Sequence, residues 1–215
     1  MADVAALRGV EYRPYAGEAD MATVTGLIDA ELSEPYSLFT YRYFLLSWPD
    51  LCWIARDVET GEAIGVIVGR IEDGSETPGA GGVPAGAGAD ASTNGDQSAA
   101  DPAAAAPPPK EGYIAMLVVV SSARRRGVGR ELVARSVAVM RASGCESVCL
   151  EAERSNAAAL RLYESMGFLR EYRLFQYYLN GSDAFRLVLA LPPAQEGQGA
   201  PDSLADAAGK RQLDK

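Results

Sequence analysis

The chain has 215 residues, 48% of them hydrophobic, which suits one folded domain of ordinary size with additional material. Its formal net charge is -9, but the acidic excess is concentrated in residues 72–110, so the remainder is close to neutral. The sequence has no histidine, which excludes Ser-His-Asp and Cys-His nucleophilic machinery and every histidine-ligated metal site.

The three cysteines, Cys52, Cys145 and Cys149, form no CxxC pair, which indicates free thiols in a reducing compartment. Residues 1–14 lack a sustained apolar run, so we expect no secretory signal. No stretch reaches the roughly 18 apolar residues of a membrane span. These features predict a cytoplasmic protein that does not enter a membrane.

The first third of the chain predicts, in order, a strand, two helices and two strands: residues 10–14, 18–32, 38–48, 51–56 and 63–71. A turn at residues 33–37 separates the helices, because the residue before Pro35 is pushed out of helical geometry. The second helix is rich in aromatic residues, and we expect that aromatic side to lie in the core.

Residues 73–110 consist almost entirely of Gly, Ala, Pro, Ser, Thr and Asp and contain no aromatic residue. Such a segment buries too little apolar surface to offset its ordering entropy, so we expect a disordered insertion within one domain of residues 1–191. The alternative, a linker between two domains, leaves residues 1–72 with few strands to close a core. Residues 192–215 are polar and small, and predict a disordered tail.

The last part predicts alternating strands and helices: strand 113–120, helix 130–142, strand 148–150, a helix after Ser155, and strands 168–179 and 184–191. Ser155 is the expected N-cap of its helix. Asn180-Gly181-Ser182-Asp183 is a strong hairpin signal between the last two strands.

Residues 124–129, Arg-Arg-Arg-Gly-Val-Gly, lie between a buried strand and a helix, and we call them the arginine–glycine loop. A helix N-terminus offers backbone N–H groups and a partial positive charge to an anion. Glycine lets the backbone approach such a ligand, and the arginines add attraction. The loop therefore predicts a pyrophosphate site, although a basic loop that is merely solvated fits these residues equally well.

The arginine–glycine loop resembles the R/Q-x-x-G-x-G/A motif of the GCN5-related N-acetyltransferases (GNAT). A second motif of that family is similar to residues spaced along 155–168: Asn156, Ala159, Leu160, Tyr163, Gly167 and Phe168. The resemblance implies an α/β fold with a mixed, mostly antiparallel sheet, splayed central strands and flanking helices. It also implies acetyl-CoA as co-substrate and no metal.

Four further segments, residues 33–37, 41–44, 112–117 and 173–181, resemble the catalytic subunits of the NatC-type N-terminal acetyltransferases. The similarity covers residues 10–191 except the insertion. It implies acetylation of the α-amino group of nascent proteins that retain an initiator methionine followed by a bulky apolar residue. It also implies a large auxiliary subunit, a small Sm-like subunit and the ribosome as partners, without direct DNA binding.

The family pattern implies that the cofactor lies along the fourth strand, over the arginine–glycine loop and against the second motif. The implied contacts are Leu117, Val118, Val119, Arg124, Arg125, Arg126, Gly127, Val128, Gly129, Asn156 and Tyr163. A backbone N–H of the same strand is the expected oxyanion donor. Asn156 has a second interpretation as part of a helix cap.

Glu151 is the expected general base, and Glu153 is its rival because strand alternation keeps both on one face. Tyr163 is the expected general acid, since a phenol stays protonated at neutral pH. Its spacing alone also fits one more position in an apolar helix stripe. These roles for Glu151 and Tyr163 follow from the resemblance.

Glu34, Tyr36, Tyr177 and Tyr178 are the expected peptide contacts, with apolar walls from residues such as Leu38. Two other functions stay open: acetylation of lysine side chains or small amines, and a non-catalytic acetyl-CoA-binding subunit. Glu151 and Tyr163 together favour an enzyme, because a module that only binds the cofactor needs neither.

Overall fold

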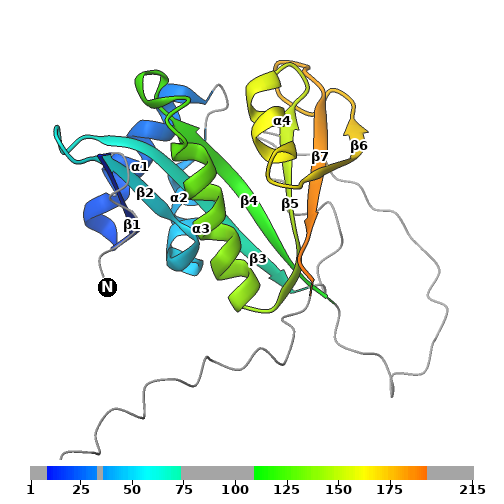
Figure 1. Cartoon of the computed structure of the whole chain (residues 1–215), viewed down its shortest axis with the longest axis horizontal. Helices are drawn as coiled ribbons and strands as arrows, with labels where there is room; N and C mark the ends of the chain where they lie inside the picture. Colours follow the sequence, from blue (N-terminus) through cyan, green and yellow to red (C-terminus); the bar gives the residue numbers. More distant parts are fainter. Residues whose placement is uncertain (1–8, 33–35, 74–108, 193–215) are drawn as a thin grey trace, which may run out of the picture.

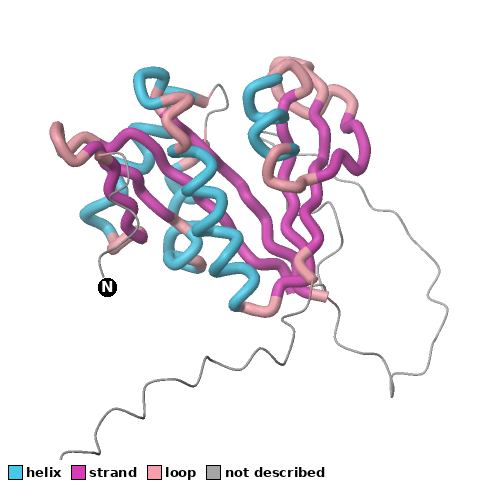
Figure 2. The backbone as a smooth tube through the Cα atoms, in the orientation of Figure 1, coloured by secondary structure: helices cyan, strands magenta, loops and turns pink. Residues whose placement is uncertain are grey.

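The computed structural model describes residues 9–32, 36–73 and 109–192. The described residues form a seven-stranded sheet in the order β1-β2-β3-β4-β5-β7-β6, with helices on both faces (Figures 1 and 2). Only the β4–β5 pair is parallel, and the other neighbouring pairs are antiparallel. The predicted mixed, mostly antiparallel sheet is therefore confirmed.

The first half contains β1 (Val10–Pro14), α1 (Glu18–Glu31), α2 (Leu38–Ser47), β2 (Trp53–Asp57) and β3 (Ala63–Asp73). The second half contains β4 (Lys110–Val119), α3 (Val128–Ala142), β5 (Cys145–Glu153), α4 (Ala157–Glu164), β6 (Leu169–Leu174) and β7 (Ala184–Ala190). Strands β3 and β4 are neighbours, with Asp73 opposite Lys110. The predicted insertion and tail lie almost entirely outside the described residues.

Each face of the sheet has its own apolar cluster because successive strand residues point to opposite sides. Ile67 belongs to the cluster beneath α3, with Leu132 and Met140 of that helix. Its neighbour Val66 belongs to the cluster beneath α1 and α2, with Ile28 and Phe44. The sheet thus separates an α3–α4 face from an α1–α2 face.

Strands β4 and β5 pair only at one end, where the register runs from Lys110↔Cys145 to Tyr113↔Cys149. Beyond Tyr113, β4 continues beside β3 alone up to Val119. Figure 1 shows the two central strands diverging from this point. The divergence opens the sheet between its two faces.

Four expected boundaries or environments were wrong. β5 extends to Glu153, so Glu151 lies within the strand and not at its end. β6 stops at Leu174, because Gln176 takes a left-handed φ of 49° and donates its N–H to the Asp183 carboxylate. The N-cap of α4 is Asn156, not Ser155. On α2 the aromatic side is only partly core, since Phe39 is 84% exposed.

Candidate active site

The arginine–glycine loop leads directly into α3. Gly127 is the N-cap, with a φ of 86° that favours glycine, and Arg125 before it also has a positive φ of 62°. The first intrahelical bond there runs from the Glu131 N–H to the Gly127 carbonyl. The N–H groups of the first turn, at Val128 and Gly129, are thus left without helical acceptors, as an anion site requires.

Two of the three loop arginines are held by carboxylates of other elements. Arg124 contacts Glu31 at the end of α1 at 2.7 Å, and it also donates to the Val119 carbonyl. Arg126 contacts Asp57 at the end of β2 at 3.1 Å. These pairs fix the loop to the domain and neutralise part of the attraction expected from three arginines.

The diverging part of β4 has an open edge. Leu117, Val118 and Val119 pair with β3 on one side, and no strand among the described residues pairs with their other side. Backbone N–H and C=O groups on such an edge can bind an extended chain that carries amides. The edge therefore fits the amide-containing arm of coenzyme A.

Gly129 lies where α3, α4 and β4 meet. A Cβ atom there would be 3.3 Å from a methyl carbon of Leu162 and 3.6 Å from one of Val119. The missing side chain thus allows close approach of the helix start to the β4 edge. The loop, helix start and edge form one continuous candidate cofactor site.

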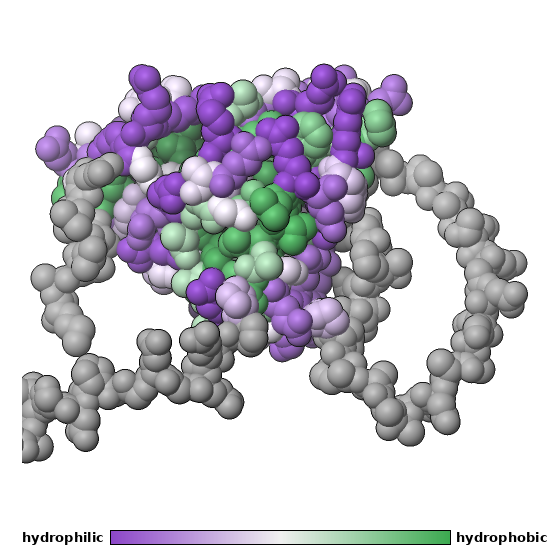
Figure 3. Space-filling view, turned by 45° about the vertical axis from the view of Figure 1, so that its right-hand side comes forward, coloured by the Kyte–Doolittle hydropathy of each residue, from purple (hydrophilic) through white to green (hydrophobic). Residues whose placement is uncertain are grey.

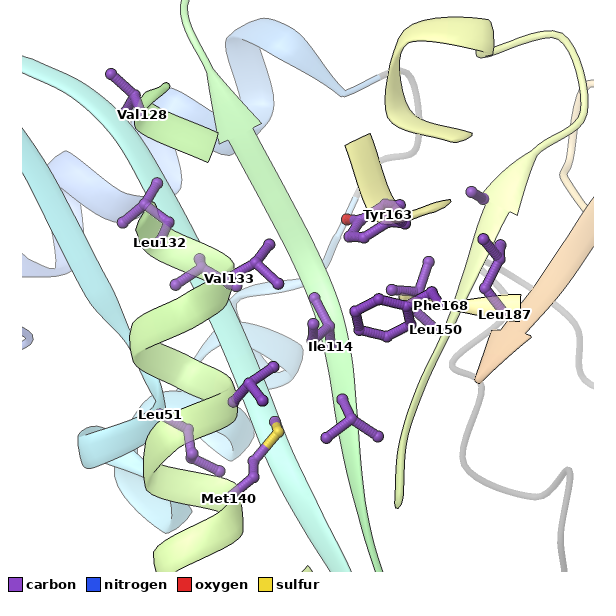
Figure 4. Packing of buried hydrophobic residues seen from close by; sticks show 14 of the residues in the cluster. Leu51, Ile114, Val128, Leu132, Val133, Met140, Leu150, Tyr163, Phe168 and Leu187 are labelled. Carbon is purple, nitrogen blue, oxygen red and sulfur yellow. The ribbon is translucent and has the colours of Figure 1, made fainter. Parts of the chain in front are cut away.

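The Tyr163 side chain points from α4 into the apolar cluster on the α3–α4 face of the sheet. Its side chain is buried, with the ring in edge contact with Phe168 at a centroid distance of 5.5 Å. Figure 4 shows its hydroxyl on the side that faces β4. Burial raises the pKa of Tyr163, which keeps the phenol protonated and able to donate.

Asn156 caps α4, since its side-chain oxygen accepts the Ala159 N–H at 3.1 Å. The capping interpretation of this residue is therefore confirmed. The cap uses the oxygen, and the amide NH₂ group is the part of the side chain that can donate to a ligand carbonyl.

Glu151 lies on the opposite face of the sheet from Tyr163. Its strand neighbours Leu150 and Ala152 belong to the cluster of the α3–α4 face, so the carboxylate points to the α1–α2 face. One oxygen accepts the Tyr113 hydroxyl at 2.7 Å, and the other contacts Arg186 at 3.2 Å. The side chain is only 8% exposed.

Tyr113 and Arg186 are site residues that sequence reasoning missed. Tyr113 was expected only as part of a buried strand, yet it is the last β4 residue paired with β5, where the two strands separate. Arg186 interrupts the otherwise apolar strand β7 and lies directly opposite Glu151 in the register. A lone arginine inside an apolar strand was the available signal.

Glu153 has a different environment from its rival. Its carboxylate accepts the Ser155 hydroxyl at 2.7 Å, and it lines an open hollow with Arg154 and Asp183. Glu151, in contrast, is buried beside Tyr113. The geometry favours Glu151 where strand alternation alone did not distinguish the two.

The loop between β6 and β7 brings Tyr177 and Tyr178 to the same region, with their rings perpendicular at 5.2 Å. Burial raises the pKa of Tyr177, nearby Glu151 adds to this, and a hydrogen bond with Tyr113 opposes it. Burial also raises the pKa of Tyr178. The hairpin tyrosines thus adjoin the Tyr113–Glu151 pair.

Tyr36 packs beside Tyr41 of α2, at 6.0 Å between ring centroids, and interacts electrostatically with both hairpin tyrosines. The expected contact Glu34 lies outside the described residues. Leu38, an expected apolar wall, is 52% exposed and so available to a ligand.

The face in Figure 3 has apolar side chains gathered in its middle, with polar residues along its upper edge.

Among the helices that the structure describes, none combines the length and apolar character that crossing a bilayer requires.

A family model described as the acetyltransferase (GNAT) family matches residues 21–168. N-alpha-acetyltransferase MAK3 of Arabidopsis thaliana is 44% identical over 183 residues, which are 85% of this chain and 78% of that protein. N-alpha-acetyltransferase 30 of Homo sapiens is 39% identical over 184 residues, 86% of this chain but 42% of that protein.

A crystal structure of the NatC complex bound to Gag peptide and CoA contains a chain with a similar fold. The TM-score is 0.67 at 37% sequence identity, and the match covers 85% of this chain and 98% of that chain. The family match and these identities, together with the loop, open strand edge and opposed side chains described above, show that the chain belongs to the acetyltransferase (GNAT) family and, within it, to the N-alpha-acetyltransferases of the NatC type.

Proposed function

We propose that this chain transfers the acetyl group of acetyl-CoA to the N-terminal amine of nascent proteins that begin with methionine and a bulky apolar residue. Glu151 acts as general base and Tyr163 as general acid. The observation that carries the proposal is the placement of these side chains on opposite faces of the sheet, where β4 and β5 separate. A similar chain in the NatC crystal structure accompanies both a peptide and CoA.

Acetyl-CoA, when bound, supplies the thioester, whose C–S bond breaks as the C–N bond to the amine forms. The β4 edge at Leu117, Val118 and Val119 holds the arm, and one N–H of this strand donates to the thioester oxygen. The first-turn N–H groups of α3 receive the pyrophosphate. Tyr163 gives its proton to the departing sulfur.

The amine loses its proton on the other side of the gap. An α-amino group has a pKa of about 7.7 to 8.0, so a modest base suffices at neutral pH. Tyr113 donates to Glu151, and the same phenol oxygen can accept from the amine. Glu151 therefore takes up the proton directly or through Tyr113.

The peptide lies on the α1–α2 face. Tyr36, Tyr177 and Tyr178 hold its first backbone groups, together with Glu34. The half-exposed Leu38 supplies apolar contact for the methionine side chain. We further propose that the chain works in the cytoplasm at the ribosome, with a large auxiliary and a small Sm-like subunit.

The test uses the full chain, alone and with those auxiliary subunits, with acetyl-CoA and four peptides. They begin Met-Leu, Met-Phe, Ser-Glu and acetyl-Met-Leu-Lys. We expect acetylation of the first two, measured by mass spectrometry. Acetylation confined to the blocked lysine peptide would show a side-chain acetyltransferase, and CoA binding without any transfer would show a non-catalytic subunit.

The same assay distinguishes Glu151 from Glu153 as the general base. Glu151→Gln and Tyr163→Phe are expected to lower kcat by about 100-fold or more, the usual contribution of a general acid or base. Glu153→Gln is the matched control, because Glu153 lies two residues from Glu151 on the same face of the strand. Its kcat should stay close to that of the parent. Parental rates for Glu151→Gln and Tyr163→Phe would refute the assigned roles.

A further inference from the structure

Arg186 connects four adjacent strands at the base of the site. From its position on β7 it contacts Glu151 on β5 at 3.2 Å and reaches across that strand to Glu111 on β4 at 2.9 Å. In the other direction it contacts Glu171 on β6 at 3.2 Å. The Arg186 side chain is 13% exposed and that of Glu151 8%, so their contact is largely shielded from solvent, whereas Glu171 is 52% exposed.

The surroundings of Arg186 are strongly acidic. The titratable groups that face it come from β4, β5 and β6: Glu111, Cys149, Glu151, Glu171 and Tyr172. Burial alone would lower the pKa of Arg186, but Cys149, Glu111 and Glu151 outweigh it and raise that pKa. The side chain is therefore a permanent cation among three carboxylates.

The contacts on Glu151 are complementary. Arg186 donates to one carboxylate oxygen and Tyr113 to the other, which fixes the plane of the carboxylate. Glu111 is itself held by the Ser147 hydroxyl at 2.9 Å, in the section where β4 and β5 still pair. Arg186 thus links the Glu151 carboxylate to the section where β4 and β5 still pair.

We propose that Arg186 is a positioning residue for the acetyl transfer: it holds the Glu151 carboxylate against the Tyr113 hydroxyl, in the orientation needed for proton uptake. This inference rests on the proposed role of Glu151 as base. Only arginine suits the position, because its planar guanidinium can donate hydrogen bonds to several carboxylates at once, whereas the lysine ammonium is a single point charge.

The test compares Arg186→Met, Arg186→Lys and Arg135→Met in the full chain, within the assembly that gives activity. Arg135 is a matched control, a 21% exposed arginine of α3 that pairs with Glu131 at 2.9 Å and lies over the Tyr12 and Trp53 rings. All variants are measured with the same Met-Leu peptide, so titration of the substrate amine is identical throughout. Thermal unfolding reports the folded fraction of each.

For Arg186→Met we expect kcat to fall about 10- to 100-fold, as for a misplaced catalytic group, with the KM for acetyl-CoA unchanged. Arg186→Lys should give an intermediate kcat, because a single point charge replaces only part of the guanidinium's contacts. Arg135→Met should lower stability only.

A kcat for Arg186→Met that is no lower than for Arg135→Met would overturn the inference. If Arg186→Met does not fold, a parental kcat for Arg186→Lys overturns it instead. In a Glu151→Gln background, Arg186→Met should cause no further loss of kcat. A parental kcat for Glu151→Gln would refute the role of Glu151 as general base. A lowered kcat for Glu151→Gln together with a parental kcat for Arg186→Met would refute only the role of Arg186.

Discussion

Asp20 is the most strongly perturbed carboxylate away from the site. Arg13 donates to both of its oxygens, at 2.6 and 2.5 Å, and the Ala16 N–H donates at 2.9 Å. The Arg13 hydrogen bonds lower the pKa of Asp20 to about 2, against the opposing effect of burial. This residue joins the end of β1 to the start of α1.

Because the folded-state pKa lies below the unfolded value, the ionised Asp20 stabilises the fold above about pH 4, and this contribution is lost as the pH falls toward 2. Asp20→Asn should therefore lower the free energy of unfolding at pH 7 by about 2 kcal/mol. The same change should make the free energy of unfolding vary less with pH between pH 4 and 2. Urea titrations at several pH values measure this. Glu18→Gln, in an exposed pair with Arg42, is the control and should change little; equal losses for both variants would contradict the prediction.

At the same scale, the roles of Glu151 and Tyr163 were implied by the resemblance to a known family, and they stay predictions. The sequence did not predict Tyr113 or Arg186, because their roles arise from strand order. Arg186 meets Glu111 only because β7 inserts next to β5, a long-range pairing that no local pattern encodes.

Among the elements, α3 packs against two glycines of the sheet through Met140. A Cβ on Gly112 of β4 would be 2.4 Å from the Met140 sulfur and 3.2 Å from the Met140 Cβ, and one on Gly69 of β3 would be 2.9 Å from the Met140 methyl. Two glycines on neighbouring strands thus make the space into which Met140 packs. This contact holds the C-terminal part of α3, which ends at Ala142, against the sheet.

Gly112→Ala should lower the free energy of unfolding by about 1 to 3 kcal/mol, because the new methyl group overpacks this contact. Adding Met140→Ala should cost less than the sum of the single changes, since the smaller side chain makes room. Gly26→Ala, in α1 with no atom near the added Cβ, is the control and should be neutral or slightly stabilising. Thermal melts measure all four, and strictly additive losses would argue against the packing explanation.

The bounds of α1 were predicted well, and the end of β6, which side-chain hydrogen bonds set, was not. The expected helix over residues 18–32 agrees with α1 to within one residue. β6 ends early because the Asp183 carboxylate accepts a backbone N–H from Gln176 and pairs with Arg173, a local competition that β-propensity does not contain.

For the whole molecule, we propose that residues 74–108 are an insertion within one domain. The strands on either side are paired up to Asp73 and Lys110, so a short turn can join them. Replacing the segment by about four turn residues should leave kcat on Met-Leu peptides unchanged. It should also raise the free energy of unfolding by about 2 kcal/mol, because a shorter loop loses less conformational entropy when its ends are brought together. Steady-state assays and urea titrations measure this. Loss of activity in the isolated chain would contradict the proposal, whereas loss confined to the assembled complex would assign the segment to partner binding.

The divergence of β4 and β5 has a consequence for the order of events. Under the proposed function each substrate reaches the gap from its own side of the sheet, so neither must depart before the other arrives. The described cysteines Cys52, Cys145 and Cys149 are all buried, and burial raises the pKa of Cys145 to about 11, which makes them poor acetyl acceptors. Under the proposed function, the acetyl group therefore passes within one ternary complex, in a sequential and not a ping-pong reaction.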